Sequence, residues 1–98
     1  MAQILLRTNR PQEASKVLRE AIELETLRVQ HSLDIALRRL KKFEQKYNIS
    51  SKRFIKEWTA EDLEDKDMEY VEWAGEYHLF SKLNERLTTL KSIQHVSS

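Results

Sequence analysis

The chain has 98 residues, and its 17 Lys and Arg against 16 Asp and Glu give a formal net charge of +1. This balance provides no overall field that would attract nucleic acid or a membrane surface, so any electrostatic argument must be local. The absence of cysteine excludes disulfides, thiol catalysis and thiolate metal sites, and fits the cytoplasm, where we expect the protein. Residues 1–98 are expected to form one domain with a modest core, which a second chain would extend.

Residues that break helices are scarce, because the chain contains one glycine and one proline. This scarcity predicts an all-α fold whose first main element is a long helix over 11–47. Thr8 or Asn9 is expected to cap its start, with Pro11 near the first helical position. Asn48 is expected to end the helix in a left-handed conformation, which asparagine tolerates better than most residues.

Residues 1–10 precede this helix and are expected to be flexible or to form a short strand. Their centre is the apolar run Ile4-Leu5-Leu6, which suits contact with a partner. The run is far too short for a signal peptide or a membrane span, so no membrane association is expected.

The long helix carries an apolar seam with the spacing of a helix that packs on another helix. In its second half, apolar residues recur at alternating steps of four and three: Val29, Leu33, Ala36, Leu40, Phe43 and Tyr47. Apolar residues also occur in the first half, on more than one face, which indicates more than one neighbouring helix. We expect four positions to form the seam of a homodimer: Leu18, Ile22, Val29 and Leu33.

Two further helices are predicted, a short one over 51–58 and a long one over 67–93. The acidic connector between them, 59–67, reads as a solvated turn. Heptad steps on the last helix place five apolar residues on one face: Trp73, Phe80, Leu83, Leu87 and Leu90. The predicted fold is a long helical hairpin with a short connecting helix, assembled into a helical bundle dimer. Gly75 lies inside the last helix, where close approach of a neighbouring backbone or a kink would account for it.

No known catalytic or metal-binding motif is present. The chain lacks His-Glu-x-x-His, a phosphate-binding glycine loop and a nucleophile elbow, and none of its three histidines follows the Glu-x-x-His spacing of helical di-metal sites. The Arg-x(4–6)-His spacing of HEPN-type nucleases is also missing. We therefore expect a protein that is not an enzyme and has no cofactor. His31 is interpreted as a residue of the helix face, whereas His78 is either that or a partner contact.

Two charged clusters have both a structural and a functional interpretation. Four cations near the end of the first long helix either offset its dipole or contact phosphate or an acidic partner: Arg38, Arg39, Lys41 and Lys42. On the last helix, three carboxylates at steps of three and four accompany two aromatic residues: Glu69, Glu72 and Glu76, with Trp73 and Tyr77. This set is either the start of an amphipathic helix or an acidic, aromatic surface for a basic protein partner.

Two segments resemble a pattern found in small prokaryotic proteins that are regarded as antitoxins of toxin–antitoxin operons. The first is Phe43-Glu44-x-Lys46-Tyr47-x-x-Ser50-Ser51-x-x-Phe54, and the second is Asp67-x-x-Tyr70-x-Glu72-Trp73. The resemblance covers roughly Phe43 to Leu90. It implies a non-catalytic cytoplasmic protein that binds and silences a partner toxin, as a dimer.

The sequence therefore predicts a protein-binding module, with antitoxin-like inhibition of a toxin enzyme as the favoured function. Two alternatives stay open. A structural homo-oligomerising coiled-coil module would show the same heptads. A small nucleic-acid-binding protein would use the cluster from Arg38 to Lys42 with Arg7 and Arg10, and its affinity would fall steeply with salt.

Overall fold

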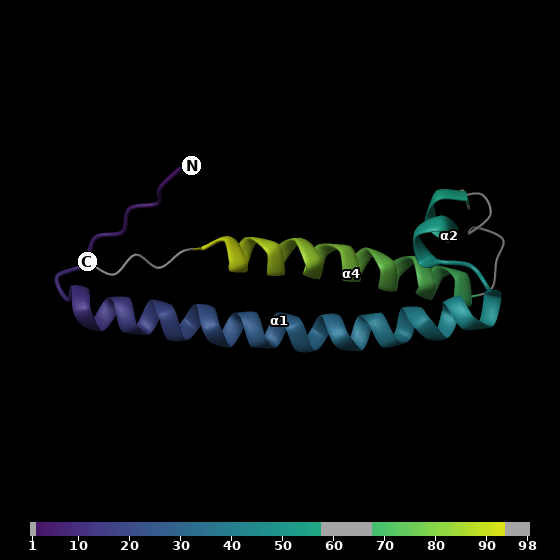
Figure 1. The fold of residues 1–98 in the computed structure, drawn as a ribbon, viewed down its shortest axis with the longest axis horizontal. Helices are drawn as coiled ribbons and strands as arrows, with labels where there is room; N and C mark the ends of the chain where they lie inside the picture. The colour runs from purple at the N-terminus through teal and green to yellow at the C-terminus, as the bar shows by residue number, and fades with distance from the viewer. Residues whose placement is uncertain (1, 58–67, 94–98) are drawn as a thin grey trace.

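The computed structural model describes residues 2–57 and 68–93, and within them the chain is helical with no strand. The helices are α1 (Pro11–Tyr47), α2 (Ser51–Glu57) and α4 (Met68–Ser92) (Figure 1). The all-α prediction is confirmed, and the predicted bounds agree to within one residue at each helix end. The predicted turn over 59–67 lies outside the described residues.

The predicted cap of α1 is wrong at its start and confirmed at its end. Pro11 occupies the first turn as expected, but the N-cap residue is Arg10, whose side chain makes no capping hydrogen bond. Thr8 was predicted as a cap and instead accepts a hydrogen bond from the Arg10 backbone N–H at 3.0 Å, outside the helix. At the other end, Asn48 adopts the left-handed conformation with φ 54° and donates its backbone N–H to the Glu44 carbonyl, as predicted.

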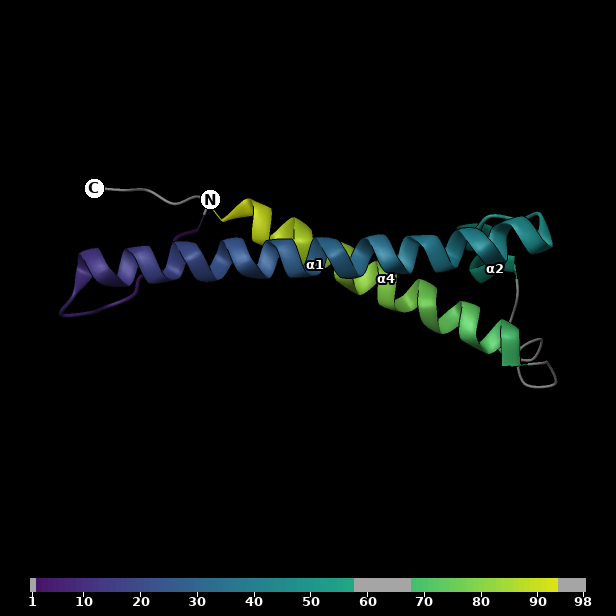
Figure 2. The same ribbon diagram turned by 90° about the horizontal axis from the view of Figure 1, so that it is seen from below.

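The molecule is an elongated hairpin of α1 and α4. The two helices run antiparallel, so that α4 starts at the end of the hairpin where α1 ends, and Figure 2 shows that they cross at an angle. The short helix α2 lies at that end (Figure 1). The principal extents are 58 × 23 × 19 Å and the radius of gyration is 19.0 Å, against about 13 Å for a compact chain of this size. This elongation leaves much of α1 outside the hairpin core.

The predicted seam of α1 is confirmed as the buried stripe that faces α4. Its buried positions are Val29, Leu33, Ala36 and Leu40. Val29 and Leu33 pack with Leu87, and Leu40 packs with Phe54 and Trp73, so the core consists of two small clusters along the hairpin. Seven apolar residues are buried among those described, which is a small core for a chain of this length.

Gly75 is not a point of close helix packing. A β-carbon built at this position would meet no heavy atom within 4 Å, so the predicted close approach of another backbone is wrong. The residue lies instead on an open face of α4. None of the described helices combines the length and the apolar composition that crossing a bilayer requires.

Candidate functional site

The first half of α1 extends beyond the end of α4 and carries the seam with it. Leu18 and Ile22 precede Val29 by eleven and seven residues, spacings that keep all three on one face of the helix. Val29 is covered by the last turns of α4, but Leu18 is 42% exposed and Ile22 is half-buried. We call residues 11–24 the uncovered end of α1. Figure 1 shows this end running past the described end of α4.

The four predicted dimer-seam residues therefore divide into two pairs. Val29 and Leu33 are 3% and 6% exposed because α4 of the same chain covers them, so they are not available at the surface of this hairpin. Leu18 and Ile22 lie on the uncovered end. Two further apolar side chains there are largely exposed on a neighbouring face, Val17 at 62% and Leu24 at 68%. Apolar side chains of this size and exposure on adjacent faces are typical of a surface that another helix covers.

Of the predicted acidic, aromatic surface, only Trp73 is buried, and this corrects the sequence interpretation of that residue. Trp73 is completely buried, stacks on Phe54 with ring centroids 3.9 Å apart, and donates its indole N–H to the Ser51 hydroxyl at 2.8 Å. The Ser51 backbone N–H in turn donates to the Glu44 carboxylate at 2.7 Å. Trp73 therefore joins α4 to α2 and cannot anchor a partner. Tyr77 is half-buried beside Phe80.

The three predicted carboxylates form one wall of a groove between α1 and α4. Its volume is about 690 Å³, and its lining is divided by charge: Arg39, Lys42 and Lys46 come from α1, Glu69, Glu72 and Glu76 come from α4, and Phe43 and Gly75 complete it. We call this the charged groove. The three cations and the three carboxylates both recur at steps of three and four, so the two walls match along the hairpin.

Ion pairs close the charged groove at both ends. Lys46 donates to Glu69 at 2.7 Å, and Arg39 contacts Glu76 at 3.5 Å. The Lys46 ammonium, followed by the Tyr47 hydroxyl that donates at 2.8 Å, holds the pKa of Glu69 below its ordinary value. Two of the three carboxylates predicted to meet a basic partner are therefore already paired within the chain.

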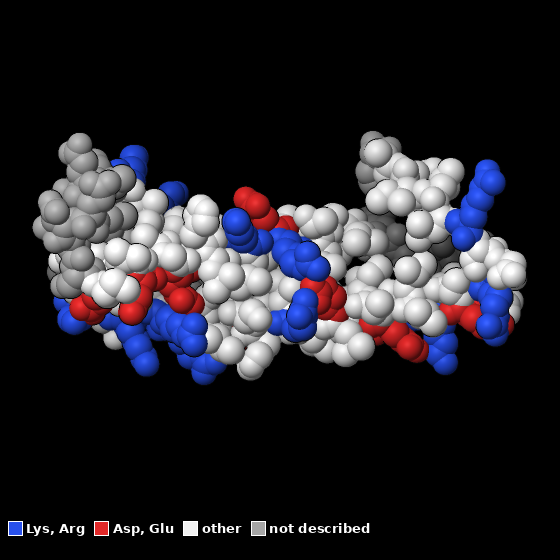
Figure 3. Space-filling model, turned by 180° about the vertical axis from the view of Figure 1, so that it is seen from behind, with Lys and Arg blue, Asp and Glu red and all other residues white. Residues whose placement is uncertain are grey.

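On the face of the described residues that Figure 3 draws, the remaining cations do not form a continuous basic surface. Arg38, Lys41 and Lys42 are exposed, but Arg39 points to Glu76, and Figure 3 shows basic and acidic groups interspersed along the hairpin on the face drawn. A phosphate backbone binds best to a continuous basic stripe. The face drawn therefore lacks the basic stripe that the nucleic-acid alternative would use.

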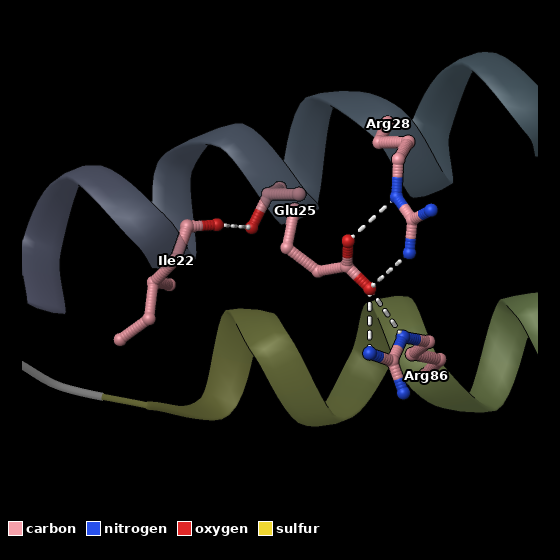
Figure 4. Close-up of polar contacts among 5 residues, drawn as sticks. Ile22, Glu25, Arg28 and Arg86 are labelled. Carbon is pink, nitrogen blue, oxygen red and sulfur yellow. Dashed lines mark hydrogen bonds and ion pairs between the residues drawn. The ribbon is translucent and has the colours of Figure 1, made fainter.

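A second ionic cluster fastens α4 to α1 near the boundary of the uncovered end. Glu25 accepts hydrogen bonds from Arg28 one turn later, at 2.7 and 3.1 Å, and from Arg86 of α4 at 2.7 Å (Figure 4). The hydrogen bonds from Arg28, and next those from Arg86, lower the pKa of Glu25 from 4.5 to about 2. Beside this cluster, the Thr26 hydroxyl donates back to the Ile22 carbonyl at 2.7 Å.

The lowered pKa of Glu25 predicts that the folded chain loses stability in acid. Because its pKa is lower in the folded chain than in the unfolded chain, its favourable contribution is complete above about pH 4.5 and disappears as the pH falls toward 2. Glu25→Gln is expected to lower the thermal midpoint at pH 7, and the difference from wild type should shrink steadily between pH 5 and pH 2. Thermal scans by circular dichroism measure this. Glu85→Gln, an exposed carboxylate beside Arg86, is the control and should show a smaller difference at pH 7.

The histidines and the N-terminal segment complete the candidate residues. His31 and His78 are both exposed, and among the residues that the structure describes no group of His, Asp and Glu is arranged to hold a metal ion. Within 2–10 the chain has no regular structure, and its apolar run is largely exposed, with Ile4 at 89%, Leu5 at 86% and Leu6 at 69%.

The charged groove and the Glu25 cluster both combine residues of α1 and α4, and neither was predicted from the sequence. The signal for the groove was the matching three-and-four spacing of cations on one helix and carboxylates on the other. For Glu25 and Arg86 no local signal exists, because the two residues are 61 positions apart.

Comparison with known proteins found no matching family model, no matching curated protein and no matching solved structure.

Proposed function

We propose that the chain is a non-catalytic protein-binding module that acts as a homodimer, with the uncovered end of α1 as a main contact. The observation that carries this proposal is the continuation of the seam through Leu18 and Ile22 after α4 has ended. A helix of about 14 residues without packing is marginal in water, so this end gains most from a neighbour.

A second copy fits this surface for a physical reason. The hairpin buries few apolar residues and is much longer than a compact domain, so its own core leaves it marginally stable. Association of two copies would bury apolar side chains that the described part of the chain leaves exposed, such as Leu18, Val17 and Leu24. One alternative from the sequence, a structural homo-oligomer, also requires self-association and differs only in lacking a further partner.

The oligomeric state is the first test of the proposal. Light scattering should report about twice the chain mass of 11.7 kDa at about 100 μM, a concentration at which a dimer with a micromolar dissociation constant is formed. A measured mass of 11.7 kDa at this concentration would show that the protein is a monomer and would contradict the proposed dimer.

We assign a toxin enzyme as the further partner, on the basis of the resemblance to antitoxins. The supporting feature is the exposed apolar run Ile4-Leu5-Leu6, which lies outside the helical hairpin in a stretch without regular secondary structure. Extended apolar segments bind by pairing with a strand or by filling alternate pockets on a partner.

The partner assignment predicts a growth phenotype. If the protein encoded beside this gene arrests growth when expressed, co-expression of the wild-type chain should restore growth. Serine at Ile4, Leu5 and Leu6 together should reduce this rescue at least tenfold in colony count. The control carries serine at three exposed apolar residues of α4 and its end: Met68, Val71 and Ile93. A harmless neighbour, or equal rescue by both triple variants, would contradict the assignment.

A further inference from the structure

The charged groove is open at its centre. Lys46 with Glu69 and Arg39 with Glu76 bridge its two ends, whereas Lys42 and Glu72 lie between these pairs on opposite walls. Both are exposed, and in the part of the chain that the structure describes neither takes part in an ion pair. The groove therefore carries one unpaired positive and one unpaired negative group.

The floor of the groove is apolar and accessible. Most of its surface is carbon, Phe43 contributes to it, and the missing side chain of Gly75 leaves free space. Leu79 is 46% exposed and follows Glu72 by seven residues and Glu76 by three, so it continues the same face of α4. This face thus combines an apolar centre with charges of opposite sign on its two sides, a combination that suits a protein interface.

We propose that the charged groove binds the same groove of a second copy, with a two-fold axis running along the helices. A rotation about this axis brings α1 of one copy over α4 of the other. The basic wall of each copy then faces the acidic wall of its partner, and Lys42 of each copy meets Glu72 of the other. The resulting dimer is a four-helix bundle with neighbouring helices antiparallel.

Charge selects this axis over the other two-fold arrangement. An axis perpendicular to the helices would place α1 on α1 and α4 on α4, so that cations face cations and carboxylates face carboxylates. Like charges in contact disfavour a complex, whereas opposite charges fix its register. The arrangement of the walls thus specifies the relative direction of the two chains.

This orientation explains how the uncovered ends of α1 are used, and it rests on the dimer proposed above. Because the axis runs along the helices, both copies point the same way and their uncovered ends lie at the same end of the bundle. Leu18 and Ile22 of the two copies then approach each other past the ends of both α4 helices. One second copy therefore covers both the groove and the extended seam.

Charge exchange tests the groove. Lys42→Glu and Glu72→Lys should each weaken the dimer about tenfold, because each change turns two attractive surface contacts into repulsive ones. An equimolar mixture of the two variants should recover the wild-type dissociation constant, since every contact between unlike chains is attractive again. Single variants as dimeric as wild type, or a mixture that does not recover, would overturn the groove as the interface.

Fluorescence energy transfer between labels on the two copies tests their relative orientation in the dimer. The chain has no cysteine, so Gln12→Cys labels one site, near the start of α1. The proposed axis places the two labels within about 30 Å, given helix spacings of about 10 Å. The opposite arrangement places them about 90 Å apart, because Gln12 precedes the groove centre by about 45 Å of helix. Efficient transfer supports the proposal and weak transfer in a dimer overturns it, whereas a monomeric wild type would instead refute the proposed dimer itself.

Discussion

Replacing Trp73 with alanine is expected to lower the free energy of unfolding by about 3–5 kcal/mol, the usual cost of removing a fully buried aromatic side chain. The indole is 0% exposed and stacks on Phe54 and on Phe43, at 3.9 and 5.5 Å between centroids. From α4 it contacts Phe43 of α1 and Phe54 of α2, so it joins the three described helices. Since small domains have about 5–15 kcal/mol of stability in total, this loss would unfold a large share of the molecules.

The hydrogen bond of Trp73 gives this prediction a second measurement. Ser51→Ala keeps the aromatic stack but leaves the indole N–H buried without an acceptor, at a cost of about 1–3 kcal/mol. Urea denaturation measures the free energy of unfolding of both variants. It is followed by far-UV circular dichroism, because a fluorescence signal would change with the loss of Trp73 itself. Val71→Ala, an exposed position on the same helix, serves as the control and should change the midpoint little. A Trp73→Ala protein as stable as this control would contradict the described core.

Glutamate at both Leu18 and Ile22 is expected to weaken self-association at least a hundredfold. Each substitution places a carboxylate on the extended seam. Burying an unpaired carboxylate in the dimer interface is unfavourable, because it loses its hydration. The hairpin itself should remain folded, because α4 does not cover either position as it covers Val29 and Leu33. Sedimentation equilibrium should therefore show a monomer. Circular dichroism should show a helix content close to that of wild type, apart from the first turns of α1.

A matched double variant separates the seam from exposed apolar surface in general. Leu37→Glu with Val71→Glu changes two side chains that are 39% and 45% exposed, similar to Leu18 at 42%, but away from the uncovered end. This control should remain dimeric. If both double variants dissociate equally, or neither does, the extended seam is not the contact.

The local signals of the sequence were enough to predict the helices. The glycine and proline content, Pro11 at the start and Asn48 at the end bounded α1, and the steps of four and three identified its buried stripe from Val29 to Leu40. These features depend on residues within a few turns of one another, so a single sequence contains them.

Which neighbour covers a stripe was not predictable from periodicity. Val29 and Leu33 have the same spacing whether their cover is α4 or a second chain, and the structure places α4 there. Trp73 was similarly ambiguous, because a tryptophan among carboxylates fits both an interface and a core. Its burial follows from the position of α2, whose Phe54 and Ser51 receive the ring and its N–H.

The charges show the same limit. Glu69, Glu72 and Glu76 were correctly placed on one face of α4, but the ion pairs of Glu69 and Glu76 with α1 depend on the register between the two helices. That register is set by the packing of apolar side chains along the whole hairpin and by contacts such as Arg86 with Glu25. Spacing within one helix carries no information about it.

Amide hydrogen exchange along α1 tests most directly whether a second copy covers the uncovered end. Amides from Leu18 to Leu24 should be protected at high protein concentration, should lose this protection on dilution below the dissociation constant, and should exchange rapidly in the Leu18→Glu, Ile22→Glu protein. Amides near Leu33 and Leu40 should stay protected throughout, because the hairpin covers them. Rapid exchange of 18–24 at every concentration, or protection that dilution does not change, would contradict the account.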